Sequence, residues 1–156
     1  MIQAIQKRLR NDEEGFTLIE LMVVVLIIAI LIAIAIPTFL GARTRAQDRA
    51  AQSDLRNGLV AAEVHYVDTE DYETADAAAL LAIEPQLVFV DGSTVSTTAP
   101  FQVGVVTTAG VNAVQLVRAS ASGTYFCIQK AATTGTGYGS GADAATALGD
   151  CGNASW

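Results

Sequence analysis

The hydrophobic pattern separates an N-terminal apolar stretch from a longer, mixed remainder. Every residue over 21–36 is apolar, and the stretch continues to Leu40 with one proline and one threonine. A helix of about 20 residues spans about 30 Å, the thickness of the hydrocarbon core of a bilayer. The pattern therefore predicts a helix that crosses a membrane over residues 16–40.

A second helical pattern follows the apolar stretch. Apolar residues recur at spacings of three and four, which places them on one helix face: Ala51, Leu55, Leu59, Ala62 and Tyr66. The other face carries Arg49, Gln52, Asp54, Arg56 and Glu63. We expect residues 41–67 to extend the apolar helix into one long helix over 16–67. Pro37 should kink this helix, since proline removes a backbone donor and crowds the preceding turn.

Residues 68–156 show short apolar runs between turn residues, which predicts a globular head. Ala77–Ile83, stopped by Pro85, predicts a brief helix, and strand-like runs occupy 87–90, 94–98, 101–107, 113–118 and 124–129. We expect an α+β fold with a lollipop shape, in which the long helix packs on an antiparallel sheet of about four strands. The glycine-rich run over 135–141 favours a flexible surface loop.

Composition and charge narrow the functional classes. Of 156 residues, 51% are hydrophobic and 16% are charged, which argues against a disordered chain. The net charge is −7, and beyond Asn57 the basic residues are Arg118 and Lys130 (His65 counted as neutral), against ten carboxylates. An acidic head is a poor match to a polyphosphate backbone, so we predict no general nucleic-acid binding.

The two cysteines, Cys127 and Cys151, both lie in the head. With an export-like N-terminus, the simplest interpretation is one disulfide formed outside the cytoplasm. It would close a loop of about 25 residues and stabilise the head by about 3.5 kcal/mol on the chain-entropy model.

The sequence lacks the parts of a catalytic site. His65 is the one histidine, and we find no nucleophile motif and no Cys/His cluster, so we predict neither an enzyme nor a cofactor or metal site. The acidic connector over 68–76 raises the alternative of calcium binding. It lacks the residue order of an EF-hand loop, which favours a solvated charged loop.

One carboxylate interrupts the start of the apolar stretch. Glu20 lies near one end, where insertion of an acidic residue into a membrane costs less than at the centre. If the chain were cut after Gly15, the new ammonium on Phe16 would lie one helical turn from this carboxylate, or could reach Glu20 of a neighbouring chain. The pair would act mainly to set register. The alternative is a Glu20 side chain that extends to the lipid headgroups.

The residues of this junction match a known family. The run GFTLIELMVVVLIIAILIAIAIPTFLGAR closely resembles the N-terminus of type IV pilins and of type II secretion pseudopilins, and the Lys/Arg-containing leader over 1–15 resembles their class III signal. The resemblance implies that a membrane aspartyl peptidase, the prepilin peptidase, cuts between Gly15 and Phe16 and N-methylates Phe16. It implies that Glu20 meets the Phe16 amine of an adjacent subunit.

The resemblance also supplies the orientation, which the flanking charges leave open because three basic residues precede the span and four follow it. The precursor would be held in the cytoplasmic membrane with its head outside, and would then enter a helical filament of identical subunits at the cell surface. An assembly platform and an ATPase are implied as partners. We therefore expect a pilin that serves adhesion, twitching motility or DNA uptake. The alternatives are a pseudopilin or minor pilin of a secretion system, and a single-pass anchored binding domain that does not polymerise.

Overall fold

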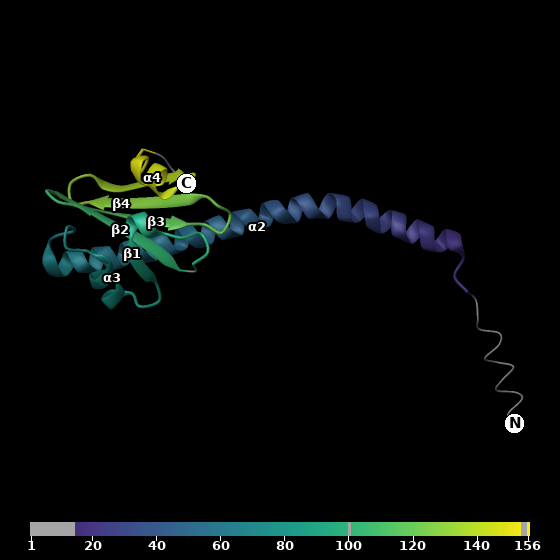
Figure 1. The fold of residues 1–156 in the computed structure, drawn as a ribbon, viewed down its shortest axis with the longest axis horizontal. Coiled ribbons are helices and arrows are strands. Elements are labelled where there is room, and N and C mark those ends of the chain that lie inside the picture. Colours follow the sequence, from purple (N-terminus) through teal and green to yellow (C-terminus); the bar gives the residue numbers. More distant parts are fainter. Residues whose placement is uncertain (1–14, 100, 154–155) are drawn as a thin grey trace, which may run out of the picture. The chain divides into compact units, whose positions relative to one another are not determined.

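A long helix runs through most of the N-terminal half of the chain. The computed structural model describes residues 15–99, 101–153 and 156, and the chain divides into two compact units, Met1–Ala42 and Arg43–Trp156. Helix α2 (Leu18–Thr69) confirms the long helix predicted over 16–67, displaced by two residues at each end (Figure 1). The helix continues through Pro37, and the kink at that residue stays a prediction.

The apolar part of α2 has no partner within the described residues. All residues over 18–40 are exposed, although almost all of them are apolar. α2 is the one helix in the described ranges that is long and apolar enough to cross a membrane. A helix satisfies its own backbone hydrogen bonds, which allows such a segment to lie in hydrocarbon.

The second part of α2 packs on a sheet through the predicted apolar face. Ala51, Leu55, Leu59 and Ala62 are buried as expected, and Tyr66 is partly buried and stacks on Tyr72 with ring centroids 4.4 Å apart. Gly58 is also buried, and a Cβ atom added to it would lie only 3.1 Å from Leu116 Cδ1. A glycine at this position lets the helix approach the sheet closely.

The short helix after the connector is confirmed. Helix α3 spans Ala77–Ile83, the predicted range, and Pro85 follows its C-cap, Glu84. Asp76 caps its start, since Asp76 Oδ1 accepts a hydrogen bond from the backbone N–H of Ala79 at 2.8 Å. Such a cap satisfies one of the backbone donors that the first turn leaves unpaired.

The sheet differs from the prediction in strand count and in one pairing. Within the described residues it holds five strands in the order β1–β2–β3–β4–β5, with bounds Val88–Asp91, Gln102–Thr108, Val111–Ala119, Tyr125–Ala131 and Gly135–Gly141. β1 pairs with β2 in parallel, and the other neighbours are antiparallel. The expected strand over 94–98 is wrong. A 3-10 turn, η1 (Gly92–Thr94), and irregular chain occupy that region.

Strand β5 corrects the interpretation of the glycine-rich run as a flexible loop. Glycine occupies every second position of β5, and the positions between hold Thr136, Tyr138 and Ser140. The glycine face lies against the chain around α4 (Ala144–Gly149). A Cβ atom on Gly141 would come within 2.6 Å of the Ala147 nitrogen. The glycines therefore keep a flat face on which a helix and the following loop can pack.

Adding a side chain to this face should destabilise the head. A Cβ atom on Gly139 would lie 2.8 Å from the carbonyl carbon and oxygen of Asp150. We expect Gly139→Val to lower the free energy of unfolding by about 1–3 kcal/mol, as overpacking does in cores. Chemical denaturation measures this loss. Gly149→Ala is the matched control, because a Cβ atom there meets nothing within 4 Å, and an equal loss in both variants would contradict the packing argument.

The cap of α4 should make part of the stability depend on pH. Asp143 Oδ1 accepts from the Thr146 backbone N–H at 2.7 Å. That N–H, followed by the Thr146 side chain, holds the pKa of the Asp143 carboxyl below its usual value. The stabilisation that the charged Asp143 cap gives the folded head is therefore complete above about pH 4. It is lost as the pH falls through the lowered pKa that Asp143 has in the folded state. Asp143→Asn keeps a non-titrating cap, and we expect its unfolding free energy to depend less on acid than that of the wild type. Identical pH profiles from denaturation at each pH would refute this.

The sheet carries a core on each face. On one face α2 and α3 bury Leu55, Leu80, Leu116 and Ile128, and on the other Ala147 of α4 packs with Val117 and Cys127. Figure 1 shows α4 and α2 on these two sides. The predicted disulfide is present, since Cys127 of β4 is bonded to Cys151, which follows α4. It fastens the α4 segment to the sheet.

Trp156 packs on the α2 side of the sheet, whereas Cys151 packs on the α4 side. The Trp156 Nε1–H donates to the carbonyl oxygens of Cys127 and Gly139, at 3.1 and 2.9 Å. Its ring meets Tyr138 edge-on at 4.7 Å between centroids. The C-terminal segment therefore contributes to both cores, through Trp156 on one face and Ala147 on the other.

A partly buried ion pair connects α2 to the sheet. Arg118 Nη2 lies 2.8 Å from Asp54 Oδ2, with side-chain exposures of 11% and 16%. Burial raises the pKa of the Asp54 carboxyl, and the Arg118 charge opposes that shift. Asp48 also faces the sheet and accepts hydrogen bonds from the hydroxyls of Ser120 and Ser122. The carboxylates of Asp48 and Asp54 on α2 therefore both bind polar partners from the sheet and its adjoining turn.

Candidate assembly site at the start of the apolar helix

The start of α2 forms a capping box. The Thr17 backbone N–H and hydroxyl donate to Glu20 Oε2 at 2.9 and 2.7 Å, and the Glu20 N–H donates to Thr17 Oγ1 at 3.3 Å. This reciprocal arrangement satisfies two donors of the first helical turn. The carboxylate is thereby fixed at the helix end, next to residues 15 and 16.

Sequence reasoning assigned Glu20 but missed Thr17. The signal was available, because Thr-x-x-Glu before an apolar run is typical of a helix start. Both hydrogen bonds from Thr17 fall on Oε2, and within the described ranges no donor is recorded for Oε1. The second oxygen is open to a cation.

Gly15 and Phe16 precede this box in exposed chain outside any helix or strand. Neither residue belongs to α2, and the Phe16 side chain is 89% exposed. Phe16, Ile19, Glu20, Val23 and Val24 line an open hollow of about 380 Å³. The carboxylate of Glu20 therefore lies on an otherwise apolar helix face, one turn from the predicted cleavage position.

The other predicted site residues lie away from this junction along the chain. Pro37 lies within α2, and the hydroxyl of the next residue, Thr38, donates to the carbonyl oxygen of Ala35 at 2.8 Å. Cys127 and Cys151 belong to the head unit. Phe16 and Glu20 line the same hollow, and Gly15 adjoins it along the chain. The predicted roles of these three residues in processing and assembly stay predictions.

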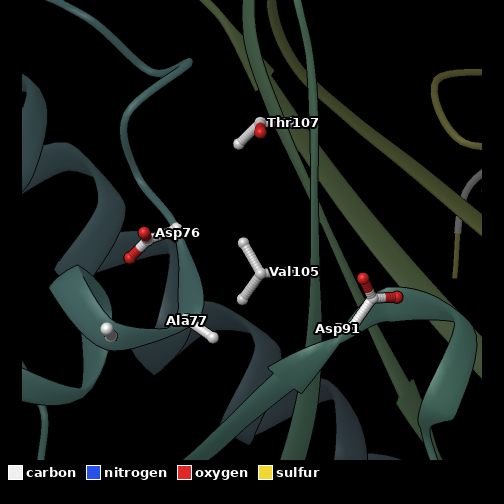
Figure 2. Close-up of a pocket in the computed structure, with 6 residues that line it drawn as sticks. Asp76, Ala77, Asp91, Val105 and Thr107 are labelled. Carbon is white, nitrogen blue, oxygen red and sulfur yellow. The ribbon is translucent and has the colours of Figure 1, made fainter.

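A second hollow, of about 400 Å³, lies in the head. Asp76, Asp91, Val105 and Thr107 line it together with two alanines at the start of α3. Figure 2 shows Asp76 and Asp91 on either side of Val105. One oxygen of Asp76 already caps α3. Within the described ranges, no three residues of the metal-ligating types gather in a metal-binding arrangement.

The acidic connector after α2 is a well-bonded turn. His65 Nε2 lies 3.0 Å from Thr74 Oγ1, and the Tyr72 N–H donates to Asn112 Oδ1 at 2.8 Å. The Gly110 N–H donates to Glu73 Oε1 at 2.9 Å. These bonds use His65 and Glu73 to hold the connector against the helix and the β2–β3 turn.

Comparisons with known proteins bear on the junction. Residues 10–36 match the family model of the prokaryotic N-terminal methylation motif, which covers the junction of Gly15, Phe16 and Glu20. The chain is also similar to the type IV wide pilus major component PilA4 of Thermus thermophilus, with 34% identity over 73 residues, 47% of this chain and 55% of that protein. Both matches support the resemblance to type IV pilins that the sequence predicts.

The matched stretch has a limited extent. The chain spans about half the length of the curated relative it matches. No solved structure shows a significant match.

Proposed function

We propose that this chain is a prepilin, the precursor of a structural subunit of a type IV pilus filament. The observation that carries the proposal is the junction of Gly15, Phe16 and the Glu20 capping box with an apolar helix exposed throughout residues 18–40. The methylation motif covers this junction. The description of the relative as a major pilus component supports a main structural subunit in preference to a minor pilin or a pseudopilin.

The proposed sequence of events follows the resemblance of the junction to type IV pilins. A prepilin peptidase removes residues 1–15 and N-methylates the new amine of Phe16, while the apolar helix holds the precursor in the cytoplasmic membrane with its head outside. An assembly platform with its ATPase then moves the subunit from lipid into the filament. There, apolar helices pack on one another, and the Phe16 ammonium of one subunit pairs with the Glu20 carboxylate of another. The filament at the cell surface serves adhesion, twitching motility or DNA uptake.

Sheared surface filaments test the proposal. Mass spectrometry of the filament protein should find an N-terminal peptide that begins at methyl-Phe16, and immunogold microscopy should label the filaments along their length. Cells that lack the prepilin peptidase are the control and should retain the chain with residues 1–15 in the membrane. A wild-type chain that keeps its leader and stays monomeric in the bilayer would overturn the proposal.

A further inference from the structure

Three arginines form an exposed stripe along α2. Arg45, Arg49 and Arg56 are separated by four and seven residues, which places them on one face of the helix. Arg45 and Arg49 have no ion pair with any residue in the described part of the chain. Arg56 lies over the Trp156 ring, with its guanidinium carbon 5.3 Å from the centroid. We call these three residues the arginine stripe.

The arginine stripe is unfavourable in the isolated subunit. Like charges four residues apart on a helix repel each other, and Arg45 and Arg49 have this spacing. With the head outside, as the proposed function requires, the stripe also lies on the translocated side of the membrane, where basic residues close to a span oppose insertion. A partner of opposite charge would offset both effects.

Carboxylates close to the stripe are committed elsewhere. Asp48 accepts from Ser120 and Ser122, and Asp54 pairs with Arg118. Glu63, further along the same helix, lies 3.2 Å from Lys130 Nζ. Within the described part of the subunit, no carboxylate pairs with Arg45 or Arg49, which leaves both charges available to a second molecule.

The opposite end of the same helical segment presents the complementary charge. Asp68 and Glu70 are exposed at the C-terminal end of α2, and no ion pair is recorded for either within the described ranges. The turn is held in place, because Asn112 Nδ2 donates to the Glu70 carbonyl oxygen at 3.2 Å and Asn112 Oδ1 accepts from the Tyr72 N–H at 2.8 Å. At about 1.5 Å per residue, Arg45 and Asp68 are about 35 Å apart along the helix.

We propose that the arginine stripe of one subunit docks on the acidic turn, Asp68 and Glu70, of a second copy of this chain. Because the two patches lie at different ends of one helix, the contact is heterologous and repeats from subunit to subunit, which generates an open filament. Complementary charges of this kind set register and partner choice. The inference rests on the proposed function, and it adds a charged contact between the second part of α2 in one subunit and the acidic turn of the next to the packing of the apolar helices.

Charge reversal tests the contact in cells that assemble wild-type filaments. We expect Arg45→Glu with Arg49→Glu, and separately Asp68→Arg with Glu70→Arg, to lower the yield of sheared filaments by about tenfold or more. The four changes together should restore the yield to within about threefold of the wild type, because the attraction is re-formed with exchanged signs. Immunoblots of the membrane fraction verify that each variant is inserted and stable.

Arg43→Glu is the matched control. Arg43 is an exposed arginine of the same helix, but it precedes Arg45 by two residues and so lies off the stripe. Its reversal should leave the yield within about twofold of the wild type. Unchanged filaments after reversal of the stripe would overturn the docking. The docking would also be overturned if the four changes together failed to restore the filament yield that Arg45→Glu with Arg49→Glu had lowered. That result would indicate anionic lipid or another polyanion as the partner. Absence of wild-type filaments would instead refute the proposed function.

Discussion

Glu20→Val and Glu20→Ala should leave the chain inserted in the membrane but lower the yield of surface filaments by about tenfold or more. The apolar span over 21–36 is unchanged in either variant, so insertion should be at least as favourable. In the proposed filament the Phe16 ammonium would then lie among apolar helices without its carboxylate, and an unpaired charge in such surroundings is strongly unfavourable. Immunoblots of membrane and sheared fractions measure the two effects separately.

Two further variants separate the charge of Glu20 from its role in the capping box. Glu20→Gln can still accept from the Thr17 N–H but carries no charge, and we expect it to assemble as poorly as Glu20→Val. Thr17→Ser keeps the hydroxyl and the charge, and should assemble normally. If Glu20→Gln forms filaments at the wild-type level, the pairing with the Phe16 amine is wrong. An ordinary membrane anchor would tolerate all of these changes.

Removing the disulfide should produce the largest loss of head stability. We expect Cys127→Ala with Cys151→Ala to lower the free energy of unfolding by about 3.5 kcal/mol, from the chain entropy of a loop of about 25 residues. The bond lies where Cys127 of β4 meets the segment after α4, so the loss should begin with α4 and β5. Guanidinium denaturation of the chain in detergent, followed by tryptophan fluorescence, measures it. Trp156 is the one tryptophan and contacts Tyr138 of β5.

Reduction of the wild-type protein provides the control for this variant. A thiol reductant should lower the unfolding free energy of the wild type to that of the double variant and should leave the double variant unchanged. A fall of less than about 1 kcal/mol in both experiments would show that packing of α4 on the glycine face, and not the covalent bond, holds this region.

Helices α2 and α3 could be predicted from sequence because their signals are local, whereas the six-residue helix α4 (Ala144–Gly149) was missed. The apolar face through Leu55 and Leu59 follows the helical period, and Pro85 marks the end of α3. The candidate assembly site was also predictable, since Gly15, Phe16 and Glu20 lie within six residues of one another along the chain. Thr17 was missed although its spacing to Glu20 is a recognised capping pattern.

The remaining errors concern strands, whose partners are distant in sequence. Glycines over 135–141 show no hydrophobic alternation, and only the contact with α4 explains why they are required. The run over 94–98 has β-branched residues, but the Ser96 N–H donates to Gln102 Oε1 and the Ser96 hydroxyl bonds to Thr98. Such side-chain hydrogen bonds compete with a strand ladder. The parallel pairing of β1 with β2 likewise has no local signal.

The hydrogen bonds at β5 bear on how neighbouring heads can meet. β5 ends the sheet, and an uncovered terminal strand invites another strand to join it. Here the carbonyl oxygens of Tyr138 and Gly139 already accept from the Gly152 N–H and from Trp156. Another strand therefore cannot pair with β5 at Tyr138 and Gly139 unless these donors are displaced, so contacts across this edge are left to side chains. In the proposed filament, exposed side chains at this edge could therefore differ without any change in the backbone pairing inside each subunit.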